Sequence, residues 1–265
     1  IRFCYYPEEE MLSYWIEKYD PDAEEAIIWV KVPEIPANSE IEIYMYYGNP
    51  TVASASDAQA TFEFFDDFES YPVGTENPGD WTSTGGANHY NCVIEDDAGN
   101  KVLGFTGYTY GDASCNSIAY HTKSLPQDIA FHLKLKSVAS GGGGSHEAAL
   151  IRYDGTVTNA TPSYALEVGY GGGYFRIFEY VGGSATKVHE SDIDETVYHD
   201  LEIRVWGNNI QVLVDGIEKY SSTFDASITG SYIGLFSAGG EPWGDLFRVR
   251  KYTSPEPSVS VGVEE

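Results

Sequence analysis

The stretch Tyr198–Gly216, which reads YHDLEIRVWGNNIQVLVDG, contains two strands joined by a turn. Apolar and polar residues alternate before Gly207-Asn208-Asn209 and alternate again after it. Strict alternation predicts strands that bury one face, and a short Gly/Asn turn between such strands predicts a β-hairpin. Asp215-Gly216 predicts a second tight turn into a third strand. We expect the rest of the chain to pack around this antiparallel meander.

Composition supports an all-β protein and excludes some partners. The 265 residues include 28 Gly and 21 Tyr, and 42% are hydrophobic, which suffices for one large β domain and a smaller one. The net charge of −26 and only 15 Lys and Arg argue against nucleic acid and against anionic membrane surfaces. No apolar run of about 18 residues is present, so no direct membrane insertion is expected in this segment.

The pattern of strands and turns divides the chain into four parts. Residues 1–50 are expected to form a small antiparallel β module that lacks its N-terminal strand region, and residues 51–63 a linker. About a dozen short strands in residues 64–252 predict a two-sheet jelly-roll sandwich. Residues 253–265 are expected to be a Pro-rich exit linker. The run GGGGS at 141–145 is either a natural loop tip, which the flanking strands favour, or an engineered linker.

The first part resembles the DUF2341 family. Four segments carry the resemblance, and they occur in the family's order: SYWIE at 13–17, DPD at 20–22, IWVKVP at 28–33 and IYMYYGNP at 43–50. The family is a module of prokaryotic, often archaeal, surface and secreted proteins, which implies an extracellular or cell-surface location. The chain departs from the family pattern in its missing N-terminal strand region and in Cys4.

The second part resembles concanavalin A-like jelly rolls of the LamG type. The segments that carry this resemblance are FDDFE at 65–69, YHDLEI at 198–203, the turn at 207–209, VLVDG at 212–216 and GDLFRVR at 244–250. The fold hosts lectins, glycosidases and adhesion modules alike, so the resemblance implies a fold more than a function.

The resemblance also implies a structural calcium ion, because in such jelly rolls Ca²⁺ often sits where the first and last strands are neighbours. Clustered carboxylates near strand ends suit its need for six to eight oxygen ligands. The alternative is that two of these acids cap a turn and the last pairs with an arginine. The candidate ligands are Asp66, Asp67, Glu69 and Asp245.

One acidic segment is a candidate catalytic motif. Glu190, Asp192 and Glu195 resemble the E-x-D-x-(x)-E signature of laminarinase-type glycosidases, which need two carboxyl groups at close spacing. The segment directly precedes the hairpin, so we expect it in the polar loop that enters the hairpin. We therefore expect that the chain is not an enzyme, and a glycoside hydrolase is the alternative hypothesis.

Aromatic residues beside Gly-rich loops are the candidates for ligand binding. Loop tips carry binding in sandwiches, and an exposed aromatic ring stacks on a sugar ring. The alternative is that these rings belong to the core or cover an edge. The candidates are Tyr108, Tyr110, Tyr170, Tyr174, Phe175, Trp206 and Trp243.

Two covalent features are also predicted. Cys92 and Cys115 are either a disulfide or two buried free thiols, and Cys4 completes an odd count. Asn159 begins the sequon Asn-Ala-Thr and is a candidate glycosylation site.

These observations predict a non-catalytic extracellular module that binds a glycan or cell-surface polymer, or contributes to a cell-surface assembly. A structural subunit of an adhesin, filament or surface layer is the alternative, in which a strand from a neighbouring copy completes the first part.

Overall fold

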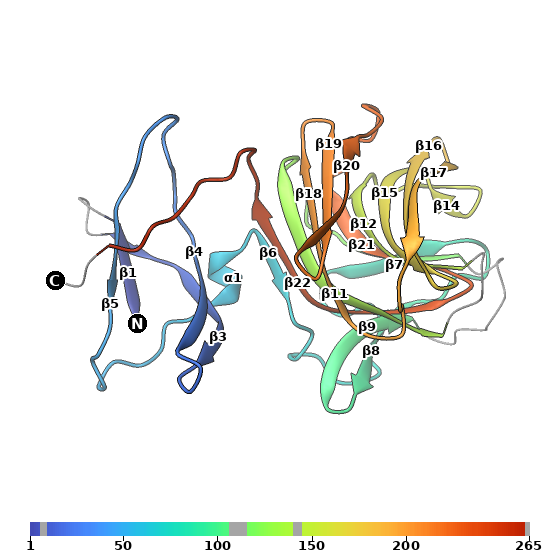
Figure 1. The fold of residues 1–265 in the computed structure, drawn as a ribbon. Helices are drawn as coiled ribbons and strands as arrows, with labels where there is room; N and C mark the ends of the chain where they lie inside the picture. Colours follow the sequence, from blue (N-terminus) through green and yellow to red (C-terminus); the bar gives the residue numbers. More distant parts are fainter. Residues whose placement is uncertain (6–9, 106–115, 140–144, 263–265) are drawn as a thin grey trace. The chain divides into compact units, whose positions relative to one another are not determined.

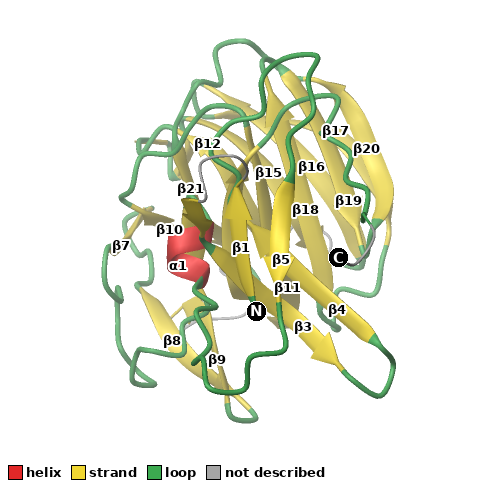
Figure 2. Cartoon of the chain, turned by 90° about the vertical axis from the view of Figure 1, so that its left-hand side faces the viewer, coloured by secondary structure: helices red, strands yellow, loops and turns green. Residues whose placement is uncertain are grey.

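The computed structural model describes residues 1–5, 10–105, 116–139 and 145–262. It divides into two compact units, Ile1–Phe65 and Asp66–Glu265. Strands dominate both, which confirms the predicted all-β class (Figure 1). The described part of the chain has one helix, α1 (Ala58–Thr61), drawn red in Figure 2. Among the described residues, no helix is long and apolar enough to cross a membrane.

The first unit contains a three-stranded sheet in the order β2-β1-β5 and a separate two-stranded pair, β3-β4. Phe3, Leu12 and Tyr14 form its buried centre, and the Tyr14 hydroxyl donates to the Ile1 carbonyl at 2.7 Å. The strands are β1 (Arg2–Tyr5), β2 (Glu10–Leu12), β3 (Tyr14–Asp20), β4 (Glu25–Val30) and β5 (Ile43–Tyr46).

Residues 51–63, expected to be a linker, carry local structure of their own. Ser56 forms a bridge with Tyr14, and the Asp57 carboxylate caps α1 by accepting from the Ala60 amide. Phe62 is buried against Trp15 and Trp29. Apolar burial therefore ties this segment to the first unit, although its small polar residues are typical of a linker. Strand β6 (Phe64–Asp66) follows at the boundary between the units.

The second unit is a sandwich of two antiparallel sheets (Figures 1 and 2). The seven-stranded sheet has the order β17-β16-β15-β12-β21-β10-β7, and the eight-stranded sheet has the order β20-β19-β18-β11-β22-β9-β8. A short pair, β13-β14, stands apart. Its strands are β7 (Trp81–Gly85), β8 (Cys92–Asp97), β9 (Asn100–Phe105), β10 (Ser117–His121), β11 (Ile129–Ala139), β12 (His146–Tyr153), β13 (Val157–Thr158), β14 (Thr161–Pro162), β15 (Tyr164–Gly171), β16 (Tyr174–Val181), β17 (Ser184–Asp192), β18 (His199–Trp206), β19 (Asn209–Val214), β20 (Ile217–Thr223), β21 (Tyr232–Ala238) and β22 (Glu241–Lys251).

The meander β18-β19-β20 confirms the predicted hairpin and its second turn. Leu201, Ile203 and Val205 are buried, whereas the residues between them are partly exposed, as the alternation predicted. Asp215 and Gly216 have φ values of 52° and 76°, so both central residues of the second turn are left-handed. This is the geometry of a tight turn whose twist matches its flanking strands.

Between the sheets the core is largely aromatic. Phe247 of β22 contacts Phe68, Trp81 and Phe131 with ring centroids 5.3, 5.5 and 5.4 Å apart. Tyr170 of β15 spans the sandwich, because its hydroxyl donates to the Leu135 carbonyl on the other sheet at 3.4 Å. The outward-facing residues of each sheet are therefore the ones available for function.

Candidate functional site

The outer face of the eight-stranded sheet gathers polar side chains from three adjacent strands. On β18 the inward residues are apolar, so Asp200 lies on the outer face. Pairing places Lys134 of β11 opposite both Asp200 of β18 and Asp245 of β22. A register shift in β22, with Leu246 at a φ of 52°, accompanies this arrangement. Residues far apart in the chain thus meet on one surface.

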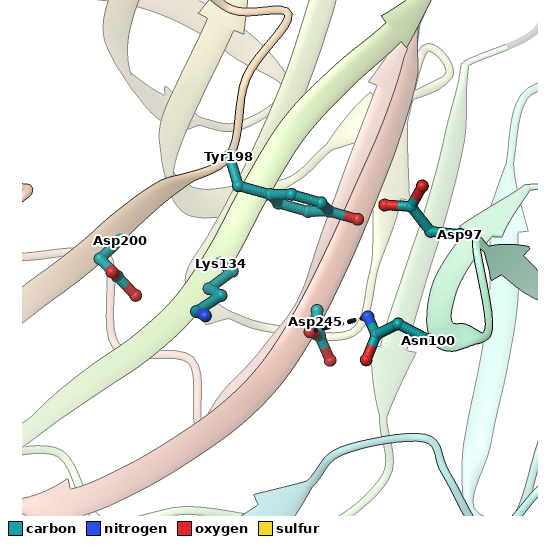
Figure 3. A pocket seen from close by; sticks show the side chains of 6 residues that line it. All are labelled: Asp97, Asn100, Lys134, Tyr198, Asp200 and Asp245. Carbon is teal, nitrogen blue, oxygen red and sulfur yellow. Dashed lines mark hydrogen bonds between the residues drawn. The ribbon is translucent and has the colours of Figure 1, made fainter. Parts of the chain in front are cut away.

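These side chains line a pocket of about 330 Å³, hereafter the polar pocket (Figure 3). Its wall from the β8-β9 turn supplies Asn100, whose amide nitrogen donates to Asp245 Oδ2 at 3.1 Å. Figure 3 shows the Tyr198 hydroxyl pointing toward the Asp97 carboxylate. The lining residues are Asp97, Asn100, Lys134, Tyr198, Asp200 and Asp245.

Lys136 joins the pocket to a second aromatic ring. Its Nζ lies 2.8 Å from Asp97 Oδ2, 4.4 Å from the Tyr198 ring centroid and 4.8 Å from the Trp243 ring centroid. A cation at these distances is attracted to both ring faces. Lys136 therefore fixes the positions of a carboxylate and two aromatic rings beside the pocket.

The surroundings of the pocket shift the pKa values of two of its carboxyl groups in opposite directions. The hydrogen bond and charge of Lys136 lower the pKa of Asp97, whereas burial raises the pKa of Asp245. Burial, together with the neighbouring Asp97, raises the pKa of the Tyr198 hydroxyl. Tyr198 is therefore a neutral hydroxyl donor at physiological pH, next to an ionised Asp97.

Replacing Lys136 with methionine should raise the pKa of Asp97 toward its usual value, because the main cause of the lowered pKa is removed. A lowered folded-state pKa stabilises the protein above the unfolded pKa of Asp, and this stability is lost as the pH falls. The variant should therefore lose less stability on acidification than the wild type. A carboxyl NMR titration of Asp97 measures the change, and an unchanged midpoint would contradict this role of Lys136.

Two further carboxyl groups flank Trp243. Glu241 Oε1 accepts a hydrogen bond from the Trp243 indole at 3.3 Å. Burial raises the pKa of Glu241, and the charge of Glu95 adds to the rise. Burial also raises the pKa of Glu95 on β8. Carboxyl groups with raised pKa beside an aromatic ring are suited to proton transfer as well as to hydrogen bonding.

Taken together, the site offers carboxylates, an amide, ammonium groups and the rings of Tyr198 and Trp243. Hydroxyl-rich ligands need donors and acceptors in this mixture, together with an apolar surface for their C–H faces. The surroundings therefore suit a carbohydrate.

The predicted binding aromatics do not form one group. Trp243 lies beside the polar pocket, whereas Trp206 ends β18 and packs against Tyr252 at 5.2 Å. Tyr174 is 38% exposed at the start of β16. Tyr170, expected in or beside a Gly-rich loop, is instead a buried residue of β15, and Phe175 of β16 is also buried. The Gly-rich sequence at 169–173 concealed that β15 continues through Tyr170. Tyr108 and Tyr110 lie outside the described residues.

The acidic segment 190–195 lies partly in a strand, not wholly in a loop as expected. Glu190 and Asp192 lie on β17, the edge strand of the seven-stranded sheet. Glu190 is bound to Arg176 at 2.9 Å and to Lys187 at 2.7 Å. Glu195 follows the strand, is buried, and accepts the Gly173 amide at 2.9 Å. Two of the three carboxylates thus have structural partners within the sheet and its turns.

The predicted calcium ligands are engaged by the chain. Asp66 is buried and accepts from the Phe68 amide and the Trp81 indole, each at 2.9 Å. Asp67 caps the Glu69 amide, and Glu69 Oε1 accepts the Lys101 amide at 2.8 Å. Asp245 bonds Asn100 in the polar pocket, not an arginine. The described residues contain no group of three or more His, Cys, Asp or Glu side chains arranged to hold a metal ion.

The cysteines and the sequon are placed as follows. Cys92 is a buried free thiol whose Sγ donates to Asn77 Oδ1 at 3.4 Å, and the disulfide with Cys115 stays a prediction. Cys4 is also buried and free, and Cys115 lies outside the described residues. Asn159 has a φ of 53° in the turn between β13 and β14. Residues 141–144 of the GGGGS run are likewise outside the described residues.

Sequence reasoning missed most of the polar pocket. Each of the missed lining residues lies in or next to a predicted strand: Asp97, Asn100, Lys134, Tyr198 and Asp200. The signal available in the sequence was the series of polar residues at every second position of each strand, which face away from the core. Only the order of the strands in the sheet reveals which of those series are neighbours.

Comparison with known proteins confirms both resemblances. Residues 1–84 match the family DUF2341, a domain of unknown function. An uncharacterized protein of Methanocaldococcus jannaschii, MJ1472, is 27% identical over 81% of this chain. The chain spans 37% of the length of that relative.

Solved structures share the jelly roll of the second unit. A structure reported with endo-acting O-glycanases that initiate mucin breakdown, expressed by members of the human gut microbiota, has a TM-score of 0.52 at 16% identity, covering 72% of this chain and all of that chain. SCLam, a non-specific endo-β-1,3(4)-glucanase of family GH16, has a TM-score of 0.50 at 12% identity, covering 71% of this chain and 89% of that chain. At these identities the likeness establishes the fold.

The comparison corrects the expectation that the chain is not an enzyme. That expectation rested on the position of Glu190–Glu195, but glycoside hydrolases such as SCLam have the same fold. The fold therefore does not separate this chain from enzymes, and one motif outside a suitable position does not exclude catalysis elsewhere on the sheets.

Proposed function

We propose that the second unit recognises a glycan at the polar pocket and the adjoining Trp243 ring. The observation that carries the proposal is Lys136, which holds Asp97, Tyr198 and Trp243 together at the pocket. This arrangement offers a stacking surface and fixed hydrogen-bonding groups side by side. Fixed groups lose little conformational entropy when a ligand binds.

Replacing Trp243 with alanine should weaken binding about tenfold, which corresponds to about 1.4 kcal/mol. The reason is the loss of the ring on which the sugar would stack. A glycan array identifies a ligand for the wild-type protein, and calorimetry with that ligand compares the variants. Tyr174→Ala is the matched control, since Tyr174 is a partly exposed aromatic residue on the other sheet. Equal loss in both variants, or none in Trp243→Ala, would refute the assignment.

Hydrolysis is a second candidate function of the same surface. It is favoured by the carboxyl groups of Glu95 and Glu241, whose pKa values burial raises beside Trp243. Glycoside hydrolysis uses one carboxyl group as a general acid, and a raised pKa keeps that group protonated. Incubation of the bound glycan with the wild type and with Glu241→Gln tests this. Product release by the wild type alone supports catalysis, whereas binding without product from either protein limits the site to recognition.

The proposal includes an extracellular or cell-surface location, where polymeric glycans are found. Antibody labelling of intact cells that produce the full-length protein tests it.

A further inference from the structure

A cluster of three arginines lies on the same outer face as the polar pocket. The arginine cluster consists of Arg204 on β18 and Arg248 and Arg250 on β22. Pairing to β11 places Ala130 between Arg204 and Arg250, and places His132 opposite Arg248. The whole chain carries a net charge of −26. A concentration of guanidinium groups on this acidic protein points to an anionic partner.

Two carboxylates of the chain meet the cluster, and one of them, Glu256, comes from the C-terminal segment. Glu256 Oε1 lies 2.5 Å from Arg250 Nη1, and Glu256 Oε2 lies 3.3 Å from Arg204 Nη2. Each carboxylate oxygen thus meets a different arginine. The second carboxylate is Glu202 on β18, whose Oε1 lies 2.6 Å from Arg204 Nε and 2.9 Å from Arg250 Nη2. The Glu256 carboxylate therefore bridges two guanidinium groups.

An aromatic ring packs against two of the guanidinium groups. The Arg204 and Arg250 guanidinium groups lie 5.6 and 5.7 Å from the Tyr252 ring centroid. Trp206 packs against Tyr252 with ring centroids 5.2 Å apart. Stacking restricts both guanidinium groups before any ligand arrives, so they are preorganised to receive a carboxylate.

The segment that supplies Glu256 is weakly attached. Residues 253–262 are exposed, and Val259 and Val261 are 89% and 97% exposed. The Glu256 side chain itself remains 32% exposed. Its ion pairs with Arg204 and Arg250 are partly solvated, which weakens them relative to fully buried pairs. A ligand carboxylate can therefore replace Glu256 at a small energetic cost.

The arginine cluster continues directly into the polar pocket. Along β11, outward-facing positions run from Ala130 beside the arginines through His132 to Lys134 and Lys136 at the pocket. Six residues of strand correspond to about 20 Å. An extended chain of sugars along β11 would reach both regions.

We propose that the arginine cluster is a subsite for the carboxylate of an acidic sugar, and that Glu256 occupies it in the free protein. The choice of a sugar rests on the proposed function of the adjoining pocket. A glycan that contains uronic acid would displace Glu256, place its carboxylate between Arg204 and Arg250, and continue along β11 into the polar pocket. Glu256 then acts as an internal competitor that lowers the apparent affinity.

The test compares an oligoglucuronate with its carboxyl-reduced, neutral counterpart, using calorimetry on the 265-residue chain. Glu256→Gln should bind the oligoglucuronate about fivefold more tightly than the wild type, because the competing carboxylate is gone. The gain should shrink as NaCl is added. Affinity for the neutral counterpart should not change. The double variant Arg204→Gln/Glu256→Gln should lose the gain.

A control variant and a peptide complete the experiment. Glu40→Gln, at an exposed glutamate of the first unit, controls for the change in net charge. A peptide copying residues 252–260 tests whether the cluster takes acidic peptides. Equal oligoglucuronate binding by the wild type and Glu256→Gln, or stronger binding of the peptide than of the oligoglucuronate, would overturn the proposal. Failure of the proposed function would appear separately. In that case the neutral glycan would not bind, or Trp243→Ala would not weaken its binding.

Discussion

Replacing Glu147 with glutamine is expected to raise the free energy of unfolding at alkaline pH by on the order of 4 kcal/mol. Glu147 lies on β12 with no exposed surface. Burial raises the pKa of its carboxyl group to about 8, and the charge of Glu195 contributes to the rise. Glutamine keeps the shape of the side chain but has no charge to bury.

The sign of the pH dependence follows from the raised pKa. Below about pH 4.5 the group is protonated in both the folded and unfolded states, so the wild type has its full stability. As the pH rises from there through about 8, the unfolded state ionises first and the wild type loses stability. Urea denaturation of both proteins between pH 4 and pH 9 measures the difference, which should grow with pH.

A matched control isolates the effect of burial. Glu218→Gln removes a carboxylate from an exposed position on β20 and should change stability little at any pH. If the difference between the wild type and Glu147→Gln is the same at pH 4 and pH 9, folding does not raise the pKa of Glu147 and the explanation fails.

Replacing Asp66 with alanine is expected to lower the free energy of unfolding by about 3 kcal/mol. The Asp66 carboxylate accepts from the Phe68 amide and the Trp81 indole, and the Tyr71 hydroxyl lies at 3.4 Å. Trp81 is only 3% exposed, so the variant would remove a hydrogen bond made by a buried indole N–H. Chemical denaturation monitored by tryptophan fluorescence measures the loss.

The neighbouring residue provides the comparison. Asp67→Ala removes an exposed carboxylate that accepts only the Glu69 amide among the described contacts, at 3.3 Å, and should cost less than about 1 kcal/mol. Equal losses in the two variants would contradict the structural role of Asp66. A rise in the melting midpoint on adding Ca²⁺ that Asp66→Ala abolishes would instead assign the carboxylate to calcium.

Local patterns in the sequence were enough to predict the fold class and the central meander. The alternation in β18 and β19 encodes which side of each strand is buried, and Asp215-Gly216 encodes the turn that follows. Both are properties of neighbouring residues, so they can be recognised without knowing any distant contact. The same local reasoning failed at Tyr170, where the glycines concealed that the strand continues through this residue.

The surface that we propose binds a glycan could not be predicted in this way. Asp97, Lys136, Tyr198 and Trp243 belong to different strands or to the segment before one, and only the order β18-β11-β22-β9-β8 brings them together. The same order places Arg204 beside Arg250, where Glu256 reaches both from a segment expected to be only a linker.

The sequence by itself thus determined which face of each strand is polar, because side chains alternate along a strand with a fixed period of two. Only the tertiary structure decided which polar faces are neighbours, because pairing between distant strands depends on how the whole sandwich closes and not on any local period.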